Sequence, residues 1–439
     1  MLHKKFTTTF IVNILFVVSV FAQETAPPVQ ADPLVPYQGE SVKGVDTSTL
    51  TGKIMTGYQG WFNAQGDGAN LGWTHWARSG SKLFAPGNVT VDLWPDMSEA
   101  TATERYVTGF TFANGEKAEV FSSHNRLTVL RHFKWMSDYG IDGAFVQRFA
   151  NGLKAGATRY HKDMVLSHCR EGANCYGRSY VVMYDLSGIG AGATSMVVSD
   201  WKMLRSKMHV GRDRAYQLHE GKPLVAIWGI GFNDGRKYTL EECRQLVQFF
   251  KADGCAVMLG VPTGWREQNR DAIKDAAFHD VLKLADIISP WTPGRYTTPA
   301  NADKHAEKYY KADIQWCRDN SMDFLPVVFP GFSWHNMKSE DPLDKIPRLK
   351  GQCLWSQFAS AKKAGASMIY VAMFDEVDEG TAIFKCTNTP PVGASPFLTY
   401  EGLPSDHYLW LNGEGGRLLR DERPVLDTVP VRPESKKGK

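Results

Sequence analysis

Residues 367–385 read SMIYVAMFDEVDEGTAIFK, and in this stretch an apolar run passes directly into a segment that holds four carboxylates. The apolar run has the pattern of a buried β-strand, and Asp375, Glu376, Asp378 and Glu379 follow at its end. Like charges this close destabilise a fold unless a metal, a cationic substrate or acid/base chemistry compensates. The stretch therefore predicts the strand that carries the functional site.

Seven similar apolar runs precede this one, separated by amphipathic stretches that are typical of helices. Continuously apolar strands are typical of a parallel sheet that is covered on both faces. Eight alternating β and α units predict an α/β protein with a single (β/α)8 TIM barrel. An open doubly wound sheet would need a glycine-rich phosphate turn after its first strand, and GYQGWF, residues 57–62, is not one. The seven runs are residues 52–61, 142–149, 179–188, 222–231, 255–265, 286–296 and 324–337.

The first residues predict an exported protein, either periplasmic or secreted. Lys4 and Lys5 precede a short apolar core that ends at VFA, residues 20–22, as in a cleavable signal peptide. No later segment is apolar enough over a sufficient length to predict a membrane span. We therefore expect residues 1–22 to be removed.

The rest of the chain is expected to form one catalytic barrel with additions. Residues 23–44 are rich in proline and polar residues and predict a flexible leader, and residues 45–385 form the barrel. An insertion at 63–124 follows the first strand and contains a hairpin signal, Asn114-Gly115. Residues 386–439 are expected to wrap around the barrel as a C-terminal extension.

Composition excludes several classes of protein. A net charge of +3 over 439 residues gives no general case for nucleic-acid binding. Seven cysteines do not make a disulfide framework, although Cys169 and Cys175 could pair or remain free thiols. No zinc pattern is present, and the acidic segment does not match a calcium loop, although a structural calcium stays open as an alternative. We expect a monomer without metal or cofactor.

Aromatic and polar residues recur where the predicted strands end, which is the active-site face of such a barrel. Tryptophans close five of the eight strands, and flat indole faces beside polar groups are typical of carbohydrate sites. A polysaccharide or oligosaccharide is therefore the expected partner. The predicted substrate-binding residues are Tyr58, Gln59, Trp61, Arg148, Trp228, Trp265, Glu267, Arg295, Trp334, His335 and Asp375.

Two carboxyl groups are the central requirement of most glycosidases, one as acid and one as nucleophile or base. Glu376 and Glu379 could form this pair, because closely placed carboxyls separate their proton affinities. Asp185 is the third predicted catalytic residue, and Glu267 is a further candidate.

FDEVDEGTAIF resembles the motif on the last barrel strand of glycoside hydrolase families 71 and 99, and GYQGWF and DGAFVQRF fit their first two strands. The resemblance implies an endo-acting, retaining α-glycosidase. It also implies that Glu376 deprotonates the 2-hydroxyl of the substrate, which gives a 1,2-anhydro sugar, and that Glu379 acts as acid and then as base. These relatives usually have Asn, Trp and His at the positions of Asp375, Val377 and Asp378.

Three alternatives stay open at this point. The sugar could be α-mannan or an anionic polymer such as a sulfated fucan. In the second case Arg148, Arg266, Arg295 and His335 would face the substrate, although they could equally neutralise carboxylates. A sugar without an accessible 2-hydroxyl would favour Asp185 with Glu379 as the catalytic pair. A non-catalytic carbohydrate-binding protein on a TIM-barrel scaffold is the competing class.

Overall fold

The parallel strands of the predicted barrel are present in the computed structural model, which describes residues 32–78 and 83–433. The predicted signal peptide lies outside the described residues. In chain order the barrel strands are β1 (Ile54–Tyr58), β4 (Gly143–Phe149), β5 (Ser179–Asp185), β7 (Lys222–Trp228), β8 (Ala256–Pro262), β9 (Ile287–Trp291), β10 (Asp323–Phe324), β11 (Val327–Val328) and β12 (Ile369–Val371).

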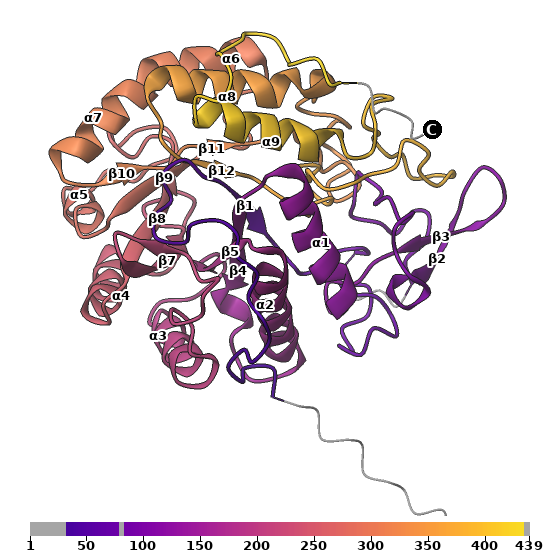
Figure 1. Ribbon diagram of the computed structural model, residues 1–439, viewed down its shortest axis with the longest axis horizontal. Helices are drawn as coiled ribbons and strands as arrows, with labels where there is room; N and C mark the ends of the chain where they lie inside the picture. The colour runs from indigo at the N-terminus through magenta and orange to yellow at the C-terminus, as the bar shows by residue number, and fades with distance from the viewer. Residues whose placement is uncertain (1–31, 79–82, 434–439) are drawn as a thin grey trace, which may run out of the picture. The chain divides into compact units, whose positions relative to one another are not determined.

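The last strand lies beside the first, because β12 pairs in parallel with β1. From β1 the sheet continues through β4, β5, β7, β8 and β9 (Figure 1). A short strand, β6 (Leu218–His219), adds an antiparallel pair to β7. The first and last thirds of the sequence therefore meet at one place in the barrel.

The seventh barrel strand is divided into two pieces, and it is much shorter than the predicted 324–337. Its first piece, β10, pairs with β9, and its second piece, β11, pairs with β12. Between them, Leu325 donates its N–H to Ile288 and the carbonyl of Pro326 accepts from Tyr370. Pro326 has no N–H to donate, so the ladder is interrupted there while the barrel still closes.

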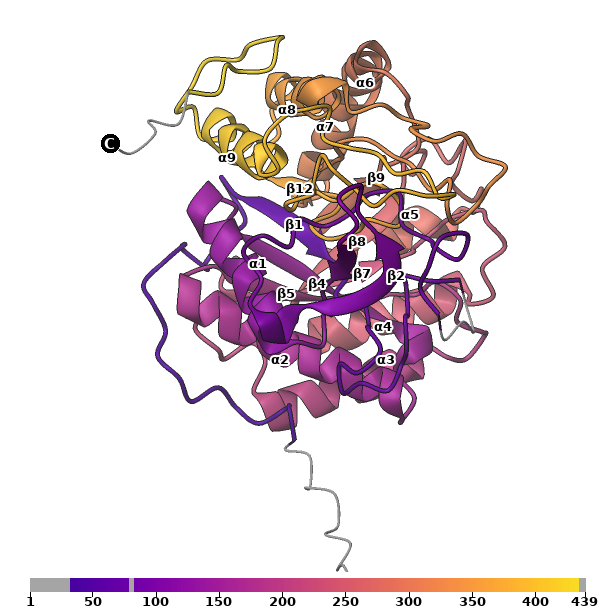
Figure 2. The same cartoon turned by 90° about the vertical axis from the view of Figure 1, so that its right-hand side faces the viewer.

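Helices cover the outside of the barrel, as Figures 1 and 2 show. Ordinary helix signals set their ends: Asn125 caps the start of α1, Gly140 ends it in the left-handed conformation, and Thr239 and Glu242 form a capping box on α4. The helices are α1 (Arg126–Tyr139), α2 (Ala157–Tyr176), α3 (Ser195–Met203), α4 (Leu240–Ala252), α5 (Ala277–Leu282), α6 (Pro299–His305), α7 (Lys311–Asp319) and α8 (Gln352–Ala364). Short 3-10 turns lie at Ala102–Glu104, Ala150–Gly152 and Leu349–Gly351, and π turns lie at Leu204–Met208 and Ala306–Tyr310.

Two apolar cores follow from the alternation of side chains along each strand. One core fills the inside of the barrel with residues such as Met55, Phe145 and Met183. The other lies between the strands and the helices and contains residues such as Ile54 and Val146. Successive residues of a strand therefore belong to different environments.

The insertion after β1 contains the predicted hairpin. Its strands are β2 (Tyr106–Thr111) and β3 (Lys117–Val120), which pair antiparallel across a turn where Gly115 has φ 88°. Another part of the insertion is fixed to the loop after β11, because the Asp92 carboxylate accepts the N–H groups of His335 and Asn336.

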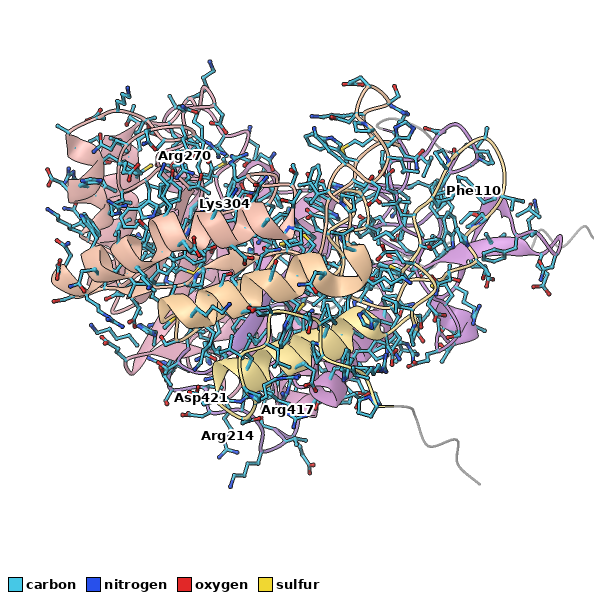
Figure 3. The ribbon with its side chains drawn as sticks, turned by 90° about the horizontal axis from the view of Figure 1, so that it is seen from above. Phe110, Arg214, Arg270, Lys304, Arg417 and Asp421 are labelled. Atoms are coloured by element: carbon cyan, nitrogen blue, oxygen red, sulfur yellow. The ribbon has the colours of Figure 1, made fainter. Side chains whose placement is uncertain are left out.

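The chain after β12 adds one helix, α9 (His407–Leu419), which packs against α1 and α8. Figure 3 shows α8 and α9 side by side, with Arg417 and Asp421 at the end of α9. Within residues 32–78 and 83–433, no helix is both long and apolar enough to cross a bilayer.

The predicted loop CREGANC is instead part of α2, and Cys169 and Cys175 are both free thiols. Six residues of a helix turn the chain through about 600°, so the two side chains point to different sides. The Cys175 sulfur lies 3.7 Å from the hydroxyl of Tyr37 instead. The possible disulfide is therefore not formed in this structure.

Candidate active site

The four carboxylates of residues 375–379 lie in a tight loop at the carboxyl end of β12. The loop returns on itself, because Phe384 donates its N–H to the carbonyl of Phe374 and Thr381 donates to the carbonyl of Glu376. Asp375 ties this loop to the end of β1, since its two oxygens accept the N–H groups of Gln59 and Gly60, both at 2.8 Å. Burial raises the pKa of Asp375 to about 7, and these two hydrogen bonds oppose the rise.

Glu376 is buried and held at both carboxyl oxygens. The Gln59 side-chain amide donates to one oxygen at 2.7 Å, and the Thr381 hydroxyl donates to the other at 2.6 Å. Burial raises the pKa of Glu376 well above its ordinary value, and the charges of Glu379 and Asp378 raise it further. The two donors orient the carboxyl group and favour its ionised form, which is the form a general base needs, and they thereby oppose the rise in its pKa.

Glu379 is half-buried, and its carboxyl group receives no hydrogen bond from any residue that the structure describes. Burial raises its pKa to about 7, Asp378 contributes in the same direction, and Lys338 opposes the rise. A carboxyl group with this pKa can hold a proton near neutral pH and release it during a reaction. Glu376 and Glu379 therefore differ in their surroundings, as an acid and a base must.

Asp378 lies between these two glutamates in the chain and contacts the insertion. Its Oδ2 lies 2.9 Å from Nδ1 of His75, while its Oδ1 has no hydrogen-bond partner among the described residues. The His75 ring stacks on Trp61 with centroids 3.9 Å apart and planes 3° apart. The insertion therefore supplies one wall of the site.

His75 is a site residue that the sequence did not predict. No local pattern marks it, because its position follows from how the insertion docks on the barrel. The only available signal was its place in an insertion that follows the first strand, above the active-site face.

Two of the predicted tryptophans, Trp228 and Trp334, cover the inside of the barrel together with Trp291 at the end of β9. Trp228, Trp291 and Trp334 are half-buried and pack against the inner core. The rings of Trp228 and Trp291 meet edge to face at 5.4 Å, and the Trp228 indole N–H has no partner in the described chain. These three rings thus cover the inner core at the active-site end of the barrel.

Asp185 is the last residue of β5, and it lies on the strand face that points into the barrel. It is buried, its carboxylate accepts the N–H of Ser187 at 2.7 Å, and burial raises its pKa. Gln147 lies on the same side, with its amide N–H donating to the hydroxyl of Tyr370 at 3.0 Å and its carbonyl oxygen unpaired within the described chain. Gln59, Gln147 and Asp185 thus present polar groups from neighbouring strands.

Two residues predicted to bind substrate face the helices instead, because their neighbours in the strand point inward. The Tyr58 hydroxyl lies 2.8 Å from Nδ1 of His132 on α1, and Tyr58 is fully buried. Arg148 is fully buried and binds Asp163 at 2.8 Å and Asp200 at 2.6 Å. The substrate-binding prediction is therefore wrong for Tyr58 and Arg148.

The predictions for the segment after the fifth barrel strand, β8, also need correction. Trp265 is fully buried against Trp316, with ring centroids 4.9 Å apart, so no sugar can reach it. The guanidinium of Arg266 binds Asp313 at 2.7 Å. The carboxylate of Glu267 accepts a hydrogen bond from the side-chain amide of Asn269 at 2.8 Å. This hydrogen bond does not involve the β12 loop.

The remaining predicted cations have protein partners as well. Arg295 binds Asp271 at 2.7 Å, and Nδ1 of His335 lies 2.7 Å from the carbonyl of Asp341. The cations that suggested an anionic polymer therefore neutralise or orient other parts of the protein. Within the described ranges, His, Cys, Asp and Glu side chains nowhere gather in threes that could hold a metal ion.

A similar fold is found in a GH99 endo-alpha-mannosidase. That enzyme, from Bacteroides thetaiotaomicron, superposes with a TM-score of 0.60 at 17% identity, over 85% of this chain and 99% of its own. A second solved structure, described as a glycoside hydrolase-like protein, has a TM-score of 0.53 at 12% identity and covers 88% and 99% of the two chains. Identities this low establish a shared fold. No family model matches this chain, and no curated protein matches its sequence.

Proposed function

We propose that this protein is a glycoside hydrolase that cleaves α-glycosidic bonds inside a glycan chain with retention of configuration. The observation that carries this proposal is the pair of glutamates on the loop after β12. Glu376 is held by donors at both oxygens, whereas no described residue donates to Glu379, whose pKa is raised to about 7. The fold shared with a GH99 endo-alpha-mannosidase supports the same proposal.

In this proposal Glu376 removes the proton from the 2-hydroxyl of the sugar, and the resulting oxygen attacks the anomeric carbon. Glu379 donates its proton to the departing glycosidic oxygen, so the first step yields a 1,2-anhydro sugar and a free chain end. Water then opens the anhydro ring while Glu379 takes its proton and Glu376 returns one to the 2-oxygen. Two inversions at the anomeric carbon give retention.

The substrate that we propose at the cleaved bond is an α-linked chain such as α-mannan. A neutral sugar at this point agrees with the crowding of carboxylates on the β12 loop, which would repel an anionic group. The half-buried faces of Trp228, Trp291 and Trp334 would pack on the sugar rings. We propose that the enzyme acts as a monomer.

Product analysis of residues 23–439 with neutral α-mannans, sulfated fucans and uronic-acid polymers tests the proposal. We expect cleavage of one class by the wild type and a loss of at least about a thousandfold in both Glu376→Gln and Glu379→Gln. Glu267→Gln is the matched control and should keep its turnover. Circular dichroism should show all variants folded.

Normal turnover in either β12-loop variant would contradict the assignment. Glycan binding without cleavage across the panel would favour a non-catalytic carbohydrate-binding protein instead.

We also propose that the protein is exported and processed. The basic residues, short apolar core and VFA sequence of the first 22 residues support this proposal. Intact mass spectrometry of protein expressed from the full gene in a bacterium should show a chain that begins at Gln23. A mass that retains residues 1–22 in exported protein would contradict it.

A further inference from the structure

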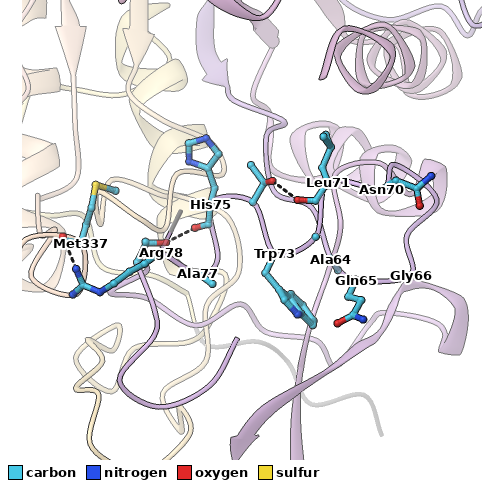
Figure 4. Close-up of a pocket in the computed structure, with 13 residues that line it drawn as sticks. Ala64, Gln65, Gly66, Asn70, Leu71, Trp73, His75, Ala77, Arg78 and Met337 are labelled. Carbon is cyan, nitrogen blue, oxygen red and sulfur yellow. Dashed lines mark hydrogen bonds between the residues drawn. The ribbon is translucent and has the colours of Figure 1, made fainter. Parts of the chain in front are cut away.

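A cavity of about 790 Å³ lies beside the β12 loop, between the insertion and the loop after β11. Figure 4 shows its wall, with Asn70, Trp73, His75 and Arg78 from the insertion and Met337, beside Arg78, from the loop after β11. Amide, indole and guanidinium groups together are the chemistry of a sugar-binding surface. The cavity has room for at least one sugar residue.

His75 connects this cavity to the catalytic glutamates. It lines the cavity, and its Nδ1 lies 2.9 Å from Asp378, which is between Glu376 and Glu379 in the chain. A glycan bound across the glutamates would therefore reach the cavity with one of its next sugar residues.

The backbone at His75 is held in an uncommon conformation, with φ 61°. The Thr90 hydroxyl donates to its carbonyl oxygen, and the Trp61 ring stacks on its side chain. Residues with a positive φ that are fixed by several contacts cluster at ligand sites.

The cavity wall carries a positive charge, that of Arg78. Arg78 is exposed and donates to the backbone carbonyls of Asn336 at 2.7 Å and Met337 at 3.4 Å. Among residues 32–78 and 83–433, no carboxylate forms an ion pair with it, in contrast to Arg148, Arg266 and Arg295.

A second cation, Lys338, directly follows Met337 of the cavity wall in the chain. Lys338 is exposed, and its Nζ is 3.6 Å from the centre of the Trp334 ring. No ion pair joins it to a carboxylate within the described chain, although its charge acts on Glu379. Arg78 thus lines the cavity, and Lys338 lies close enough to Glu379 for its charge to oppose the rise in the pKa of that carboxyl.

We propose that the cavity binds a sugar residue of the substrate that carries an anionic substituent, a sulfate, phosphate or carboxylate group, with Arg78 as its main ligand. This inference rests on the proposed function and names the substrate class of the same site. The β12 loop is rich in carboxylates and excludes an anion from the cleaved sugar, whereas the cavity offers a guanidinium that pairs with no carboxylate of the described chain. The substrate would therefore be neutral at the cleaved bond and charged at a neighbouring residue.

The test is binding to the Glu379→Gln variant, because this variant separates binding from hydrolysis. Three probes are measured by calorimetry, each against its own neutral form: phosphorylated mannan and the same mannan without phosphate, sulfated and desulfated fucan, and a uronic-acid polymer before and after carboxyl reduction. We expect one charged form to bind at least about tenfold more tightly than its neutral form, with a Kd that weakens as salt rises.

Arg78→Ala in the Glu379→Gln background should abolish this preference and leave the neutral form unaffected. Arg78→Lys should keep part of it, because the charge remains and the planar fork is lost. Arg212→Ala is the matched control, since Arg212 is exposed and precedes β6 at the other end of the barrel. Unchanged melting temperatures would show that the variants fold.

Equal affinity for charged and neutral forms in all three probes would overturn the inference. An equal effect of Arg78→Ala and Arg212→Ala would overturn it too, because it would indicate nonspecific attraction. Hydrolysis of neutral glycans by the wild type would in either case leave the proposed function standing.

Discussion

Each of the four carboxylates on the β12 loop has a different environment. These different environments allow one short segment to accommodate four acidic side chains. Asp375 binds two backbone N–H groups, Glu376 binds two side-chain donors, Asp378 faces His75, and Glu379 has no hydrogen-bond donor among the described residues. Burial is the main cause of the raised pKa values of Asp375, Glu376 and Glu379. Asp378 acts on all three, because its charge raises each of these pKa values.

Asp378→Asn should therefore change the pH dependence of the reaction. Removing the charge lowers the pKa of Glu379, so the proposed acid loses its proton at lower pH. We expect the alkaline limb of kcat/KM against pH to move down by about one unit. A profile across pH 4–9, with Glu267→Gln as the control on an exposed carboxylate, measures the shift. An unmoved alkaline limb would show that Asp378 does not tune Glu379.

At the level of secondary structure, the strands of the barrel could be predicted from the sequence, but the direction of the side chains at their ends could not. Eight apolar runs were sufficient to predict the barrel, because parallel strands that are buried on both faces have a distinct composition. The direction of each side chain at a strand end depends on one residue of register, which the apolar pattern alone does not fix. Gln59 and Gln147 face inward, while the adjacent Tyr58 and Arg148 face the helices.

The insertion was the least predictable element. Its hairpin could be recognised from Asn114-Gly115, but the position of His75 beside Asp378 depends on long-range docking through groups such as Asp92. Such contacts leave no periodic pattern in the sequence.

Arg148→Met should destabilise the fold without a direct effect on substrate. Arg148 on β4 binds Asp163 on α2 and Asp200 on α3. Its removal leaves these two buried carboxylates with the longer pairing to Arg159, at 3.8 and 3.6 Å. We expect a loss of about 3 to 5 kcal/mol in the free energy of unfolding, measured by urea denaturation. The KM of the folded variant should stay near the wild-type value.

Arg126→Met is the matched control, because Arg126 pairs with Glu171 on the surface. We expect it to cost less than about 1 kcal/mol. Equal stabilities of the two variants would contradict the structural role of Arg148.

The buried carboxyl groups of the site make the free energy of unfolding of the whole molecule depend on pH. The pKa of Glu379 is about 7 in the fold, against the ordinary value of 4.5 in an unfolded chain. Between these values the folded protein binds more protons than the unfolded chain, so stability falls as pH rises through this window. Asp375 acts in the same direction, because its pKa is also raised to about 7.

Glu379→Gln should therefore raise the melting temperature at pH 8 by about 2 to 4 °C and change it little at pH 4.5. Thermal unfolding at both pH values measures the difference. Glu267→Gln should show no such gain, because Glu267 is exposed and its pKa is lowered. A gain of equal size at both pH values would point to packing and contradict the electrostatic explanation.

The hydrogen bond between Gln59 and Glu376 joins residues 317 positions apart, from the first and the last strand of the barrel. A ribosome that has made seven strands has produced neither proposed catalytic glutamate, and a complete but unfolded chain has not yet brought the amide to the carboxylate. The appearance of enzymatic activity during synthesis would therefore mark the moment at which the two ends of the barrel meet.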